Sequence, residues 1–145
     1  MRTIKGPGLF LAQFARDEAP HNSLESIAHW AKNYGYAGIQ VPCGDKRFFD
    51  FDKAYESETY CDEVKGRLAG IVITELSSHY QGQMVSVHPA YDLMFDGQCP
   101  PEYKGNPEAR RHWAADAVKK AARVSRRLGC TESVSFTGSN SANLT

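Results

Sequence analysis

Four side chains at the ends of predicted strands have chemistry suited to holding a small polar ligand. His79 follows the third predicted strand, where it can hydrogen-bond to a ligand hydroxyl; the alternative is a histidine satisfied by loop backbone. Gln40 ends the second predicted strand, and its amide can bind a hydroxyl but cannot act as a base at neutral pH. Phe14 and Phe136 end the first and fourth predicted strands. They can form an apolar wall against a ligand, although aromatic residues at strand ends are more often part of the core.

Glu75 is a fifth candidate, on the third predicted strand. Strand alternation places it on the same face as Ser77 and His79. If that face points inward, Glu75 is either a buried polar partner of His79 or part of a structural ion pair. The structural role is the preferred interpretation, and Glu75 is kept among the candidate substrate-binding residues.

A possible metal cluster lies in the segment that follows. His88, Asp92 and Asp96 are residue types that bind metal ions, but their spacing is not diagnostic. A lid or a solvated loop is the preferred interpretation. The sequence therefore predicts no metal-binding residues in this chain.

Composition excludes several functional classes. The 145 residues carry 17 basic and 17 acidic side chains, so the formal charge is zero, and 41% of the residues are hydrophobic. These values are typical of a globular chain, and they provide no basic surface for nucleic acid or anionic lipid. No apolar run approaches the roughly 20 residues of a membrane helix, and no signal peptide is recognisable. The four cysteines lack CxxC spacing, so we expect free thiols in a reducing cytoplasm.

The elements that must position the candidate residues alternate between strand and helix. Strands are predicted at about 8–14, 37–42, 71–78 and 132–138, and helices at about 22–34, 58–69 and 106–129. Residues 43–57 are predicted to form a polar loop. Residues 79–105 form a long connection rich in glycine, proline and aromatic residues, and loops of this length are usually functional.

This alternation indicates a parallel sheet with right-handed crossovers. Two architectures fit it: an open doubly wound sheet, or a (β/α)8 barrel that stops halfway. No glycine-rich phosphate loop follows the first strand, which weakens the nucleotide-binding doubly wound folds. The polar or aromatic strand ends suit a barrel, in which the chemistry gathers at the carboxyl ends of the strands.

Several segments, in order, resemble one family. They are the first-strand residues 8–14, the segment Trp30–Gln40, the segment Ile73–Gln83, His88–Tyr91, and the helix end at 126–130 leading to Phe136–Gly138. Over about residues 6 to 138 the chain resembles the xylose isomerase-like TIM-barrel superfamily, and within it the sugar phosphate isomerase/epimerase group.

The resemblance implies a partial (β/α)8 barrel of about four βα units. Residues 1–138 would be the N-terminal half of such a barrel, and residues 139–145 a polar tail. The family moves a proton on a sugar or polyol, usually with a divalent metal such as Mn, Mg, Co or Zn, whose ligands lie on strands five to eight. The resemblance favours a substrate-binding role for His79. It also leads us to expect that this chain is a truncated, catalytically incomplete half.

Two alternatives remain open. The chain is a non-enzymatic α/β module that binds a sugar or polyol, or it is a half-barrel that acts only as a homodimer paired through its exposed sheet edges. A nucleic-acid enzyme of the same superfamily is disfavoured by the zero net charge. The expected partner is therefore a small sugar or polyol, and neither nucleic acid nor a membrane.

Overall fold

The structure, a computed structural model, describes residues 4–130 and 132–138. Its elements are β1 (Gly8–Phe10), α1 (Leu24–Asn33), β2 (Gly38–Pro42), α2 (Phe51–Glu56), α3 (Glu58–Gly66), β3 (Val72–Ser77), α4 (His79–Met84), α5 (Pro107–Leu128) and β4 (Glu132–Val134), with 3-10 helices η1 (Leu11–Gln13), η2 (Pro89–Gln98) and η3 (Pro101–Tyr103). The predicted alternation of strands and helices is confirmed.

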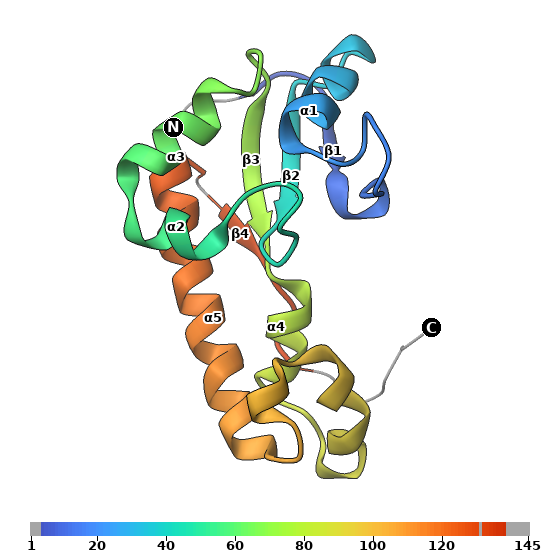
Figure 1. The fold of residues 1–145 in the computed structure, drawn as a ribbon, viewed down its shortest axis with the longest axis vertical. Coiled ribbons are helices and arrows are strands. Elements are labelled where there is room, and N and C mark those ends of the chain that lie inside the picture. Colours follow the sequence, from blue (N-terminus) through green and yellow to red (C-terminus); the bar gives the residue numbers. More distant parts are fainter. Residues whose placement is uncertain (1–3, 131, 139–145) are drawn as a thin grey trace. The chain divides into compact units, whose positions relative to one another are not determined.

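The four strands form one parallel sheet in the order β1-β2-β3-β4 (Figure 1). Spatial order therefore follows chain order. Gly8 pairs with Gly38 and Phe10 with Gln40, and β2 pairs with β3 from Gly38 onward with one register shift after Ile39. The predicted parallel α/β sheet is confirmed.

The chain divides into two compact units. The first contains the described residues within Met1–Ser77 and Ala121–Ser133, and the second those within Ser78–Lys120 and from Val134 onward. The predicted polar tail, 139–145, lies outside the described residues.

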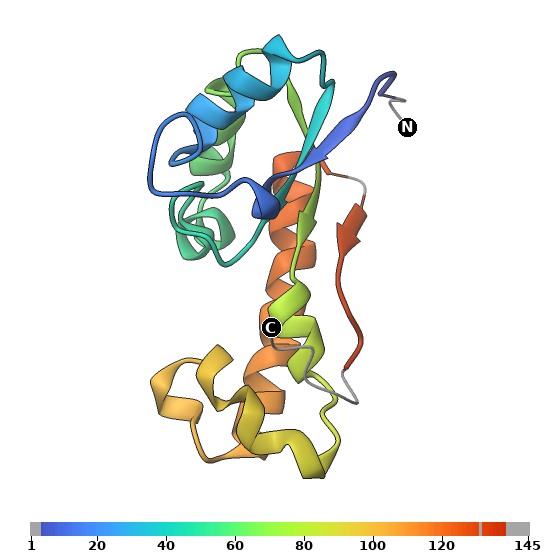
Figure 2. The ribbon, with the colours of Figure 1, turned by 90° about the vertical axis from the view of Figure 1, so that its right-hand side faces the viewer.

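The core of the first unit lies on one face of the sheet. Strand residues of this face meet helical residues there: Leu9 of β1, Ile39 and Val41 of β2, Ile73 and Leu76 of β3, Ile27 and Ala31 of α1, Cys61 and Val64 of α3, and Ala121, Val124 and Leu128 of α5. Figure 2 shows α1 and α3 on the same side of these strands. Burial of this apolar face is the main force that holds the helices to the sheet.

The second unit has a small core of its own. Met84, Val87, Phe95, Cys99 and Ala114 are buried together, and Tyr103 and Trp113 pack against them. The segment 79–105, which we predicted to be an irregular connection, therefore contains α4, η2 and η3. The glycine and proline content of this segment argued against helices in the sequence. The short helices are held by packing around Phe95, and a regular apolar periodicity does not mark them.

Side-chain caps begin three of the helices and explain one further difference from prediction. The predicted loop 43–57 contains α2, whose N-cap Asp50 accepts a hydrogen bond from the Lys53 backbone N–H. Helix α1 is capped by Ser23, whose hydroxyl accepts a hydrogen bond from the Ser26 backbone N–H. Asn106 caps α5, because its Oδ1 accepts a hydrogen bond from the Ala109 backbone N–H at 3.0 Å.

All four cysteines are free in the structure, as expected. Burial raises the pKa of the Cys43 thiol to about 12.

Among residues 4–130 and 132–138, no helix has the length and apolar character needed to cross a membrane.

Candidate functional site

A row of three side chains crosses the sheet face opposite the core of the first unit. In the sheet register, Phe10 of β1 stands beside Gln40 of β2, and Gln40 stands beside Glu75 of β3. Their neighbours Leu9, Ile39 and Leu76 are buried in the core, so strand alternation directs this row to the other face. We call this surface the Gln40–Glu75 face.

An irregularity in β3 sets the position of Glu75. Ile39 pairs with Ile73, but the next residue, Gln40, pairs with Glu75, so Thr74 is an extra residue in β3. The bulge places both Ile73 and Leu76 in the core while Glu75 meets Gln40. Gly38 is required here, because a Cβ on it would lie 2.3 Å from the Thr74 methyl group.

Gln40 and Glu75 form a direct hydrogen bond. Gln40 Nε2 donates to Glu75 Oε1 at 2.6 Å, and both residues are half-buried. The Gln40 amide keeps a second N–H and a carbonyl oxygen, and Glu75 keeps a second carboxylate oxygen. Such a pair offers both donors and acceptors to a ligand hydroxyl, which itself donates and accepts.

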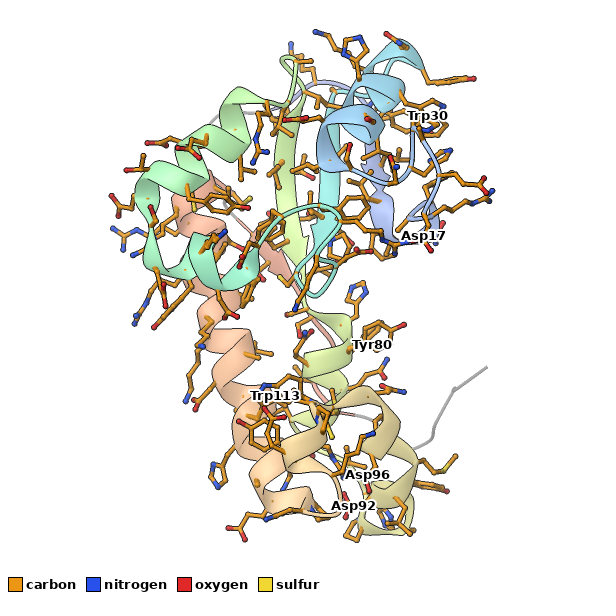
Figure 3. The ribbon with its side chains drawn as sticks, viewed as in Figure 1. Asp17, Trp30, Tyr80, Asp92, Asp96 and Trp113 are labelled. Atoms are coloured by element: carbon orange, nitrogen blue, oxygen red, sulfur yellow. The ribbon has the colours of Figure 1, made fainter. Side chains whose placement is uncertain are left out.

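An arginine ties together the loops that follow β1 and β2. The Arg47 guanidinium donates to Asp45 at 2.7 and 2.9 Å and to Asp17 at 3.0 Å. Figure 3 labels Asp17 in the loop after β1. The bond from Arg47 holds the pKa of the Asp45 carboxyl below its usual range. Arg47 therefore links the loops at the carboxyl ends of these two strands.

The second unit brings His79 and Phe136 together. His79 is the first residue of α4, and its ring stacks on Phe136 with centroids 4.6 Å apart. Phe136 remains 49% exposed, so the stacked pair borders solvent. The sequence placed both residues at strand ends; in the structure α4 begins directly after β3, and β4 ends before Phe136.

Backbone contacts hold the segment 134–138 against α4. The Ser78 N–H donates to the Val134 carbonyl at 2.9 Å, and the Gly138 N–H donates to the Gly82 carbonyl at 2.8 Å. The Ser135 hydroxyl donates to the Ser78 carbonyl at 3.2 Å. The approach at Gly82 is so close that a Cβ there would lie 2.0 Å from the Phe136 carbonyl oxygen.

The environment of His79 predicts a pH dependence of stability. Desolvation lowers the pKa of His79 below its ordinary 6.5, so the folded protein binds this proton less readily than the unfolded chain. The unfolded state then carries more protons below about pH 6.5, and the free energy of unfolding falls as the pH is lowered. We expect urea midpoints to drop between about pH 7 and pH 5, with a smaller drop in His79→Gln. Equal pH profiles for the two proteins would contradict this assignment.

Phe14, the other predicted aromatic wall, has a different environment. It lies beyond β1 and packs against the first-unit core, with its ring 5.5 Å from Trp30 and 6.5 Å from His21. Phe14 is therefore part of an aromatic cluster with α1. The aromatic side chain that the sheet register places beside Gln40 is Phe10.

The two carboxylates near His88 form ion pairs with an arginine. Arg110, which is fully buried, donates to Asp92 at 2.8 Å and also to Asp96, while His88 Nδ1 accepts from the Ala90 N–H as the cap of η2. Figure 3 shows Asp92 and Asp96 in this part of the second unit. Across the described residues, no three metal-ligating side chains converge.

Three of these residues were missed by sequence reasoning. Phe10 was overlooked because the first strand was predicted to continue to Phe14, whereas the turn of η1 ends it at Phe10. Arg47 has a near partner in Asp45, but its second partner, Asp17, lies 30 residues away. The two partners of Arg110 lie 14 and 18 residues away, and no local pattern signals such distant pairs. The apolar run of β1 did carry a signal, since Phe10 alternates with the buried Leu9.

No family model matches the chain, and a search of curated proteins finds no significant match.

Proposed function

We propose that the Gln40–Glu75 face binds the hydroxyl groups of a sugar or polyol, and that the four strands are the first half of a (β/α)8 barrel of the xylose isomerase-like type. The observation that carries the proposal is the hydrogen-bonded pair of Gln40 and Glu75 on the sheet face opposite the core. An amide and a carboxylate there can bind neighbouring hydroxyls, and Phe10 supplies an apolar surface beside them.

The strand order supports the barrel over the doubly wound alternative. A doubly wound sheet reverses its strand order at a switch point and carries helices on both faces. Here the order is sequential, and α1, α3 and α5 all pack with the strand residues of one face. Right-handed crossovers between sequential parallel strands produce this one-sided arrangement, which is the pattern of a barrel wall.

The reaction class rests on the resemblance in sequence. It implies isomerisation or epimerisation, in which a proton moves between neighbouring carbons of the sugar. The described residues do not provide a metal site, since Asp92 and Asp96 bind Arg110 and Glu75 already accepts a bond from Gln40. We therefore assign hydroxyl binding to this chain and derive no step through a metal.

Calorimetric titration tests the proposed binding. The probes are d-xylose, myo-inositol and fructose 6-phosphate, each with and without Mn²⁺. We expect saturable binding of at least one probe, weakened about tenfold in Gln40→Leu and in Glu75→Gln, because each change removes a hydrogen-bonding group. Glu63→Gln, the same change at an exposed position of α3, should bind like the unmodified chain. Equal affinity in all variants, or no binding, would contradict the proposal.

The strand order also favours a second candidate, a half-barrel that acts as a homodimer. In the described sheet, β1 and β4 stand at the two ends of the order, and parallel edges of this kind invite pairing with another strand. Sedimentation should then show a dimer, with ligand binding lost on dilution to monomer. A monomer that binds the sugar probes at all concentrations would instead identify a binding module that needs no second copy.

A further inference from the structure

A shallow pocket lies on the outer side of α1 in the first unit, lined by residues of α1 together with Pro20 and Arg67 and not by the sheet. Its volume is about 570 Å³, within the range of small-molecule sites. The lining residues are Pro20, Glu25, Ser26, His29, Trp30, Asn33 and Arg67. None of them belongs to the Gln40–Glu75 face, so this pocket is a separate feature of the molecule.

Helical spacing builds the pocket from two neighbouring rows. Glu25, His29 and Asn33 repeat every four residues, and so do Ser26 and Trp30. Residues four apart lie above one another on a helix surface, so a polar row runs beside a row that ends in an indole. Arg67, just after α3, completes the polar side.

Three neighbouring rings pack against the indole of Trp30 and fix its position. Its ring centroid lies 5.1 Å from those of His21 and Tyr34 and 5.5 Å from that of Phe14. Figure 3 shows Trp30 on α1. Trp30 is half-buried and lines the pocket, so part of its surface is presented to a ligand without further loss of side-chain freedom.

The polar side of the pocket is electrically balanced. Glu25 and Arg67 face each other at 3.5 Å, with side chains 53% and 47% exposed. An exposed pair of this kind is weakly bound, so both groups can turn to a ligand at little cost. Because the two formal charges cancel, the pocket favours a neutral ligand that both donates and accepts hydrogen bonds.

We propose that this pocket binds a neutral saccharide, with one sugar ring stacked on Trp30 and its hydroxyls bonded by Asn33, Glu25 and Arg67. A pyranose has an apolar C–H face for the indole and a rim of hydroxyls for planar amide, carboxylate and guanidinium groups. A shallow opening also leaves room for the neighbouring units of an oligosaccharide. The site is independent of the proposed function, since it uses none of the same residues.

The two tryptophans of the chain allow a direct test. Trp113 belongs to the second unit, so Trp113→Phe leaves Trp30 as the single fluorescent indole. In this background, titration with xylotriose, cellotriose and maltotriose should give a saturable change in emission for at least one of them. Asn33→Ala and Arg67→Met should each weaken that binding about fivefold, the effect of losing one hydrogen bond.

Two controls separate this site from the sheet. Trp30→Phe, which keeps Trp113, should show no saturable change in emission, whereas Gln40→Leu should leave the Trp30 response intact. The proposal is overturned if none of the three sugars changes Trp30 emission at a sugar concentration of about 10 mM. It is also overturned if the Asn33 and Arg67 variants bind as well as the parent. Loss of the Trp30 response in Gln40→Leu would place the sugar on the Gln40–Glu75 face instead.

Discussion

Replacing Arg110 by methionine is expected to lower the free energy of unfolding of the second unit by about 3 kcal/mol. The change leaves two carboxylates without their cationic partner, because Arg110 is fully buried and donates to both Asp92 and Asp96. Removing one partner of a buried ion pair costs about 3 to 5 kcal/mol. The lower end applies, since the Asp92 and Asp96 side chains are 14% and 24% exposed. Urea unfolding in a Trp30→Phe background, in which Trp113 is the single tryptophan, measures the loss by fluorescence.

The control for this variant is Lys119→Met, on the same helix. Lys119 pairs with Asp116 at 3.0 Å, but both side chains are mostly exposed, so stability should change by less than about 0.5 kcal/mol. Adding Asp92→Asn and Asp96→Asn to Arg110→Met should restore part of the stability, because the stranded charges are then removed. If Arg110→Met and Lys119→Met had equal effects, the buried ion pairs would not stabilise η2.

Replacing Gly82 by alanine is expected to displace the segment 134–138 from α4. The new Cβ would lie 2.0 Å from the Phe136 carbonyl oxygen, so the backbone must move. Forcing an extra carbon into such a contact costs about 1 to 3 kcal/mol. The His79–Phe136 stack should separate, and the pKa of His79, which desolvation lowers, should rise toward 6.5. Urea unfolding and an NMR titration of His79 measure the two effects.

Gly66→Ala is the matched control for Gly82→Ala. Gly66 ends α3, and a Cβ there would meet nothing within 4 Å in the described part of the chain. Alanine is the better helix former, so this change should be neutral or stabilising by up to about 1 kcal/mol. Equal stability and an unchanged His79 titration in Gly82→Ala would show that the segment does not depend on this close approach.

The alternation of strands and helices was predictable because it rests on local signals. Helix α5 carries its own start signal in Asn106 and Pro107 and a long apolar stripe, and it begins where the sequence predicted. Helix α4 has six residues, includes Gly82 and has no side-chain cap, so no local signal predicts it. The 3-10 helix η2 begins with the His88 cap and Pro89, but it also depends on tertiary contacts such as the burial of Phe95 and the ion pairs of Arg110.

The candidate site was predictable in its residue types and less so in its geometry. Gln40 and Glu75 were both identified, yet their pairing depends on the bulge at Thr74, which strict alternation along β3 does not reveal. Phe14 was chosen in place of Phe10, because the apolar run continues past the point where η1 turns the chain. His79 and Phe136 were chosen as strand-end residues, but their stacking depends on the contact between Gly82 and Phe136.

The most direct test of the central proposal is to follow the side-chain amide resonances of Gln40 by NMR during titration with a sugar. We predict that d-xylose, myo-inositol or fructose 6-phosphate shifts the Gln40 NH₂ signals in a saturable way. The same ligand should leave the signals of Gln13, an exposed glutamine of η1, unchanged. Gln40 signals that stay fixed with all three ligands would contradict sugar or polyol binding at the Gln40–Glu75 face.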